Sequence, residues 1–198
     1  MIGLLERWLK HAALEVQEYV QLTIAAFTGA LTRPFYRHDI IEQLDLIGFA
    51  SLTVVLLAGL FTGMALASQS GLTLDQFGAR PVVGRLVSAS MIKELGPVLT
   101  ALMLTGRIGS GIAAELGSMV VTDQINALRA LGTDPVRKLV VPRVLAGISM
   151  APALTAVSDL IGILGGWVIA RFQLQVSSSV YWAQVTKGLY IEIGRAHV

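Results

Sequence analysis

The sequence contains no cysteine, and it carries few charged residues. Without cysteine, disulfide frameworks, Cys-based metal sites and thiol chemistry are excluded within these 198 residues. Charged residues make up 14% of the chain, whereas soluble domains usually carry about 25%. The formal net charge is only +2 and no run of lysine and arginine occurs, so nucleic acid is not an expected partner.

Sequence motifs for nucleotide, metal and nucleophilic chemistry are also missing. No G-x-x-x-x-G-K-[ST] motif occurs, so the chain is not expected to bind ATP or another cofactor by itself. The histidines are scattered and lack the H-E-x-x-H spacing, which argues against a metal site. Ser110 stands directly between two glycines, which is not the G-x-S-x-G spacing of a nucleophile elbow. None of these sequence motifs therefore points to catalysis by this chain.

Apolar residues, by contrast, are abundant: they make up 54% of the chain, and the mean hydropathy is +0.69. Three apolar segments are long enough to cross a hydrocarbon core of about 30 Å, at residues 46–67, 86–121 and 144–170. The first carries no charge, and the third carries only Asp159. The sequence therefore predicts an all-α membrane protein with about three transmembrane helices.

The second apolar segment contains four charged residues: Lys93, Glu94, Arg107 and Glu115. Such side chains must face protein, water or the interface, because exposing a charge to lipid is costly. Arg107 and Glu115 are two helical turns apart, so they share one side of the helix without touching. We interpret them, with Asp159, as structural intramembrane charges that pair with neighbouring helices. The alternative for Arg107 is that its side chain extends to the lipid headgroups.

Residues 1–34 precede these segments and are predicted to form an amphipathic helix that ends before Pro34. At 100° per residue, its apolar side chains fall within one arc: Leu5, Trp8, Leu9, Ala12, Val16, Tyr19 and Val20. This pattern is typical of a helix that lies in the membrane interface. The alternative is a helix packed on a soluble core. Glutamates interrupt any apolar core that a signal peptide would need.

The connections between the segments differ from them in composition. Residues 68–85 and 171–190 are predicted to be polar connections, the second with aromatic residues at the interface. Two G-x-x-x-G pairs, Gly59–Gly63 and Gly162–Gly166, favour close helix packing. More basic residues lie in 1–45 and 123–143 than in the other two connections, which places the N-terminus and 123–143 in the cytoplasm.

The stretch at 122–132 is the feature around which the rest of the chain is arranged. It is predicted to be a short helix, capped by Thr122 or Asp123 and ended by Gly132. A second short helix would follow, capped by Asp134 with Pro135 at its first position. Because this helix lies between two membrane-length segments, it must lie outside the lipid, where a soluble partner can bind. The alternative is an ordinary cytoplasmic loop with helical turns.

Six ordered motifs occur along the chain: Lys93-Glu94-Leu95-Gly96-Pro97, Gly106-Arg107-Ile108-Gly109-Ser110, Ala114-Glu115-Leu116-Gly117, Thr122-Asp123-Gln124-Ile125-Asn126-Ala127-Leu128, Gly132-Thr133-Asp134-Pro135 and Val141-Pro142-Arg143. They resemble those of the MlaE permease family, the membrane subunits of bacterial ABC transporters that move phospholipids or related lipids between membranes. The resemblance covers about residues 1–190.

The resemblance implies a multi-pass permease of the bacterial inner membrane that forms a homodimer. Each copy would dock on a cytoplasmic ABC ATPase, which binds the ATP and Mg, through the coupling helix at 122–132. Other expected partners are a periplasmic substrate-binding protein of the MCE type, a possible STAS-domain subunit, and membrane lipids.

The resemblance also implies roles for particular residues. Those expected to bind lipid are Lys93 and Glu94 at the outer end of the site, and Gly63, Met64 and Leu66 along its apolar wall. Lys93 and Glu94 could instead form the start of an interfacial helix. Those expected to contact the ATPase are Thr122, Asp123, Ile125, Leu128, Arg129, Leu131 and Asp134.

The family fold has about five spans, so the permease domain at 35–191 is expected to be incomplete. The tail at 192–198 shows no spanning pattern and is expected to be foreign to the family. A different class of function also fits the charges: a secondary transporter or intramembrane enzyme, using Glu94, Arg107, Glu115 and Asp159 as a proton relay or acid–base set. The short helix at 122–132 distinguishes the two, because a self-sufficient carrier does not need it.

Overall fold

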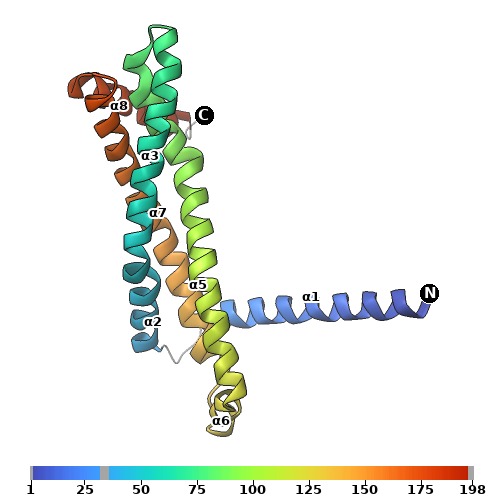
Figure 1. The fold of residues 1–198 in the computed structure, drawn as a ribbon. Coiled ribbons are helices and arrows are strands. Elements are labelled where there is room, and N and C mark those ends of the chain that lie inside the picture. The colour runs from blue at the N-terminus through green and yellow to red at the C-terminus, as the bar shows by residue number, and fades with distance from the viewer. Residues whose placement is uncertain (1, 32–35, 196–198) are drawn as a thin grey trace. The chain divides into compact units, whose positions relative to one another are not determined.

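The computed structural model describes residues 2–31 and 36–195, and no strand occurs among them (Figure 1). The contacts between residues divide the chain into two compact units. Unit 1 comprises Met1–Asp45 and Ile112–Ile148, and unit 2 comprises Leu46–Gly111 and Ser149–Val198. The expected end of the first helix near Pro34 lies outside the described residues.

Twelve helical segments follow one another along the described residues. They are α1 (Ile2–Leu31), α2 (Arg37–Leu44), η1 (Asp45–Phe49), α3 (Ala50–Gln76), η2 (Arg80–Val82), α4 (Val83–Ser90), η3 (Met91–Leu95), α5 (Gly96–Val121), α6 (Gln124–Ala130), η4 (Val136–Val140), α7 (Val141–Phe172) and α8 (Ser178–Arg195). Three continuous runs are long and apolar enough to cross a membrane: Arg37–Gln76, Arg80–Val121 and Val136–Phe172. The predicted all-α class and its three spans are confirmed.

The connection predicted at 68–85 is wrong, because α3 continues to Gln76. The hydroxyls of Ser70 and Thr73 donate to carbonyls of their own helix, Leu66 O at 2.6 Å and Gln69 O at 3.2 Å. Polar residues satisfied in this way do not end a helix. The helix ends at Gln76, and Gly78, whose φ is 65°, then takes the chain out of the right-handed helical region.

The connection predicted at 171–190 contains a helix, since α8 begins at Ser178, and α8 is not among the three runs long and apolar enough to cross a membrane. Tyr181 is fully buried in unit 2, although the sequence suggested an interfacial aromatic residue. Its hydroxyl donates to Ile163 O at 2.8 Å, so the polar end of the ring is satisfied inside the core. The side chain of Tyr190, another aromatic residue of this segment, lies outside the described residues.

Unit 2 is held together by close contact between α3 and α7. A Cβ atom on Gly59 would lie 2.8 Å from Ser158 O, and one on Gly63 would overlap the carbonyl oxygen of Gly162. The two backbones can therefore approach only because these positions lack side chains, as the G-x-x-x-G pairs predicted. Two apolar clusters surround this contact, one around Met91 and Tyr181 and one around Val55 and Leu104.

In unit 1, the C-terminal part of α1 packs on η4 and the start of α7. Ala26 is buried, and a Cβ atom on Gly29 would lie 3.0 Å from Val141 Cγ2. Earlier in α1, the predicted apolar arc is exposed: Trp8, Val16 and Tyr19 are 67%, 62% and 71% exposed. These side chains pack on no protein core among the described residues, which favours the interfacial interpretation of α1. Leu5 and Leu9 of this arc have side chains outside the described residues.

Candidate functional site

The short helix α6 lies at the tip of unit 1, in the turn between the end of α5 and the start of α7 (Figure 1). Its C-terminal end is formed by Gly132, whose φ is 75°. The amide of Thr133 donates to Leu128 O at 3.0 Å, and the amide of Gly132 donates to Arg129 O at 3.0 Å. These bonds satisfy carbonyls that the end of a helix leaves unpaired, so Gly132 ends α6 as predicted.

Asp123, one of the two residues predicted to cap α6, is its N-cap residue, but no side chain forms the cap. Asp123 has a left-handed backbone conformation, with a φ of 58°, and its side chain makes no capping hydrogen bond. Its carboxylate instead accepts a hydrogen bond from Asn126 Nδ2 at 2.9 Å. The Thr122 hydroxyl donates back to Ser118 O at 2.8 Å, within the last turn of α5. Both candidate caps are therefore engaged elsewhere.

The loop after α6 is ordered by Asp134. Its carboxylate accepts a hydrogen bond from the amide of Val136 at 3.0 Å, as predicted for the start of the next helix. The same carboxylate lies 3.4 Å from Arg137 Nε. Asp134 is exposed, so this pair contributes modestly to stability but fixes the direction in which the chain leaves α6.

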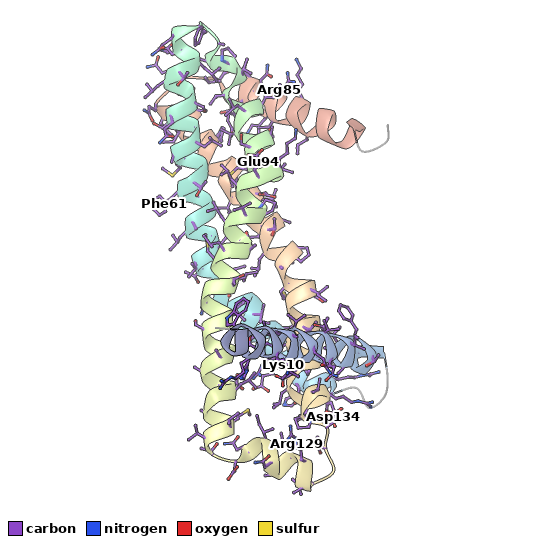
Figure 2. The ribbon with its side chains drawn as sticks, turned by 90° about the vertical axis from the view of Figure 1, so that its right-hand side faces the viewer. Lys10, Phe61, Arg85, Glu94, Arg129 and Asp134 are labelled. Carbon is purple, nitrogen blue, oxygen red and sulfur yellow. The ribbon has the colours of Figure 1, made fainter. Side chains whose placement is uncertain are left out.

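The large apolar residues expected to contact the ATPase are unevenly exposed. Ile125 and Leu128 are half-buried, whereas Leu131 is 80% exposed. Arg129 is also exposed, and Figure 2 shows it on α6 close to the loop that carries Asp134. Leu131 and the charged residues beside it therefore form an exposed surface between two spans, of the kind that a partner protein can bind.

Lys93 and Glu94 lie in unit 2 on η3, a π-helical segment between α4 and α5. Both side chains are exposed, and Figure 2 shows Glu94 on the outer surface of its helix. Single π-helical turns inside longer helices are frequent at functional sites, because they displace side chains from the regular helical positions. The structure therefore presents this charged pair at an irregular turn rather than inside the helix packing.

Asp159 of α7 lies next to this turn, a relationship that sequence reasoning missed. Its Oδ1 atom occupies the place where a Cβ atom on Gly96 would lie, two residues after Glu94. The same oxygen is buried and has no hydrogen-bond partner among the described residues. Thr100, one turn further along α5, likewise has a buried hydroxyl without a partner in the described part of the chain. In the sequence, the only sign of this relationship is that Asp159 and Thr100 are polar residues within apolar segments.

The residues assigned to the apolar wall of a lipid site lie in helix contacts of unit 2. Gly63 is buried against α7. Met64 is half-buried, and its Cγ atom would lie 3.2 Å from a Cβ atom on Gly165. Leu66 packs against the cluster that contains Tyr181. Gly63 and Met64 therefore lie at the α3–α7 contact, and Leu66 lies at the apolar cluster of unit 2.

The other intramembrane charges each contact another helix. Arg107 Nη1 donates to the carbonyl oxygen of Ala50, at the start of α3. Glu115 Oε2 lies 2.6 Å from Nη2 of Arg143, at the start of α7. With Asp159 beside Gly96, the three charges have three different neighbours.

Three membrane-length helices, an amphipathic first helix and a short exposed helix between two spans define a multi-span α-helical membrane protein. The described residues contain no cluster of three His, Asp or Glu side chains that could hold a metal ion. The sequence pattern of the family described as Permease MlaE matches residues 40–192. The chain therefore belongs to the MlaE permease family, and the resemblance found in the sequence is confirmed.

Relatives of known description support this assignment. The chain is 41% identical to a probable ABC transporter permease protein of Rickettsia bellii, over 85% of this chain and 65% of the relative. It is 39% identical to the intermembrane phospholipid transport system permease protein MlaE of Haemophilus influenzae, over 73% of this chain and 55% of the relative. It is 38% identical to a probable ABC transporter permease protein of Synechocystis, over 81% of this chain and 61% of the relative. The chain thus spans less than two thirds of the length of these relatives.

Proposed function

We propose that this chain is part of the permease subunit of an ABC transporter that moves phospholipids or related lipids between membranes. ATP hydrolysis would take place in a separate ATPase subunit, which binds ATP and Mg, so the permease itself is not an enzyme. The observation that carries the proposal is α6, a short helix with an exposed apolar residue between two spans of a MlaE-family chain. The name of the Haemophilus influenzae relative supports phospholipid as the cargo.

Force from the ATPase would enter the permease through α6. The exposed side chain of Leu131 would insert into a groove of the ATPase, with Arg129 and Asp134 at the polar rim. Thr122, Asp123, Ile125 and Leu128 would then support the contact from within unit 1, since the first two are hydrogen-bonded locally and the others are half-buried. The distribution of basic residues supports a cytoplasmic position for α6, in a bacterial inner membrane.

The remaining partners follow from the family. A second copy of the permease would complete the lipid site, and α5 offers small residues for that contact, since a Cβ atom on Gly106 or Gly109 would meet nothing within 4 Å. An MCE-type periplasmic protein would receive or deliver the lipid, and a STAS-domain subunit would bind the ATPase. Lys93 and Glu94 would contact the lipid headgroup, while Gly63, Met64 and Leu66 would shape the helix contact behind it.

One purification tests this proposal directly. The full-length permease, expressed with its ATPase and purified through a tag on the permease, should retain the ATPase and bound phospholipid, detected by mass spectrometry. Phe77→Asp is a suitable control, because Phe77 is 78% exposed and lies between α3 and η2 in unit 2. This variant should retain both the ATPase and the phospholipid. A permease that purifies without ATPase and without phospholipid would contradict the proposal.

A further inference from the structure

Two cavities of unit 1 share one buried residue, Arg143, and differ in chemistry. The first has a volume of about 170 Å³, and its polar lining consists of Asp39, Glu42, Gln43, Glu115, Lys138 and Arg143. The second has a volume of about 270 Å³ and is apolar apart from Arg143: α1 contributes Leu22, and the other helices contribute Ile112, Leu116, Val140 and Val144. Because Arg143 lines both, a polar cavity lies next to an apolar one, which is the arrangement that the headgroup and one acyl chain of a lipid would need.

The polar cavity contains charges of both signs. Lys138 forms an ion pair with Asp39, and Arg143 lies 2.6 Å from Glu115. Glu42 is a third carboxylate, so the cavity has an excess of negative charge. An anionic headgroup would add to that excess, whereas a zwitterionic headgroup brings an ammonium group that offsets it.

Two buried polar groups in this cavity lack partners among the described residues. The side chain of Arg143 is 7% exposed, and its Nε and Nη1 atoms have no hydrogen-bond acceptor in the described part of the chain. The Oε1 atom of Gln43 has no hydrogen-bond donor there. Buried polar groups are normally hydrogen-bonded, so these atoms call for a ligand that offers both an acceptor and a donor. A phosphate oxygen is an acceptor and a primary amine is a donor, whereas a quaternary ammonium cannot donate.

We propose that unit 1 holds one phospholipid of the phosphatidylethanolamine type, with its headgroup in the polar cavity and one acyl chain in the apolar cavity beneath α1. The exposed apolar side chains of α1, including Trp8 and Tyr19, place this site at the membrane interface, where bilayer lipid has access. The site shares no residue with the proposed cargo site at Lys93 and Glu94, and it does not depend on the proposed transport activity.

Lipid binding to the delipidated full-length permease tests this site. Short-chain phosphatidylethanolamine, phosphatidylcholine and phosphatidylglycerol would be added separately, and binding measured by native mass spectrometry. We expect phosphatidylethanolamine to bind about tenfold more tightly than phosphatidylcholine, the difference expected for one additional hydrogen bond to a charged group. It should also bind more tightly than phosphatidylglycerol, whose net negative charge adds to that of the cavity. Gln43→Leu should abolish its advantage over phosphatidylcholine. Ile112→Trp should fill the apolar cavity and weaken the binding of all three lipids.

Two further variants keep the test decisive. Glu42→Lys changes an exposed residue at the polar cavity, so it should fold normally and shift the preference toward phosphatidylglycerol. Val20→Trp enlarges an exposed side chain of α1 away from both cavities and should leave binding unchanged. Equal binding of the three lipids, or no shift in Glu42→Lys, would overturn the proposal and leave cavities that contain only water. Neither outcome bears on whether the ATPase copurifies.

Discussion

Arg143, at the start of α7, forms an ion pair with Glu115 of α5: their Nη2 and Oε2 atoms are 2.6 Å apart. The side chain of Arg143 is 7% exposed, whereas that of Glu115 is 45% exposed. The pair therefore joins two helices of unit 1 through a buried guanidinium group. If the carboxylate is removed, the charge of Arg143 remains buried without its counter-ion, which is costly.

We expect Glu115→Gln to destabilise the protein by about 1–3 kcal/mol, the range for a charged hydrogen bond lost at a buried partner. Thermal unfolding in detergent measures this change. Glu18→Gln, at an exposed position of α1, is the matched control and should have no effect. Arg143→Met in the Glu115→Gln background should recover part of the loss, because it removes the unbalanced charge. An unchanged melting temperature for Glu115→Gln would show that the pair is not structural.

The contact between α3 and α7 gives a second prediction. Gly63→Ala places a methyl group on the carbonyl oxygen of Gly162, a backbone atom that can move only if the helices separate. The expected cost is about 1–3 kcal/mol, typical of overpacking, measured as lower thermal stability. Gly147→Ala is the matched control, because a Cβ atom there meets nothing within 4 Å. Equal stability of the two variants would contradict this packing.

Tyr181 gives a prediction that depends on pH. Burial raises the pKa of its hydroxyl above the ordinary value near 10. Such a hydroxyl contributes fully to the free energy of unfolding below its unfolded pKa, and this contribution is lost as the pH rises further. The stability of the parent should therefore begin to fall near pH 10. At pH 8, Tyr181→Phe should lose about 0.5–1.5 kcal/mol, because the bond to Ile163 O is absent. Between pH 10 and 11 the variant should lose less stability than the parent, measured by unfolding in detergent. Parallel pH profiles would argue against a buried hydroxyl.

Sequence periodicity and composition predicted the helical class and the spans, because hydrophobic length is a local property. The same local reasoning failed at Ser70 and Tyr181. Ser70 looked like part of a polar loop but donates to its own helix, and Tyr181 looked interfacial but satisfies its hydroxyl on another helix. In both cases the hydrogen-bond partner decides the outcome, and composition does not show it.

The candidate site was predictable only in part, for the same reason. Gly132 and Asp134 carry turn signals that act within a few residues, so the end of α6 and the start of the next helix were predicted correctly. The proximity of Asp159 to Gly96 joins residues far apart in the sequence, and no periodicity reports such a contact. The left-handed conformation of Asp123 was also hidden, since aspartate is compatible with either conformation.

Lys93 and Glu94 are exposed on η3, so substitutions there should affect function more than folding. We expect Lys93→Met and Glu94→Gln to purify at normal yield with the ATPase and to lower lipid transfer between vesicles. Loss of the charge would weaken contact with a phosphate or amine of the headgroup, by about tenfold if one charged hydrogen bond is lost. Arg85→Ala, at an exposed position of α4, is the control (Figure 2). Normal transfer by both variants would remove these residues from the lipid path.

The central claim is that α6 transmits force from a separate ATPase. Leu131 is the exposed apolar residue of this helix, and burying a leucine at an interface contributes about 1.5–3 kcal/mol. Leu131→Asp should therefore lose this contribution and bury an unpaired charge in the complex, while the free permease, in which the residue is exposed, remains folded. Leu128→Asp should have the same effect on coupling but also lower the stability of the permease, because Leu128 is half-buried.

The most direct measurement is ATP-driven lipid transfer by the full-length permease reconstituted with its ATPase, comparing Leu131→Asp with Phe77→Asp. We predict that Leu131→Asp inserts and dimerises normally, no longer retains the ATPase and transfers no lipid when ATP is added, whereas Phe77→Asp behaves as the parent. If Leu131→Asp and Leu128→Asp both retain the ATPase and transfer lipid at the parental rate, α6 is not the coupling element.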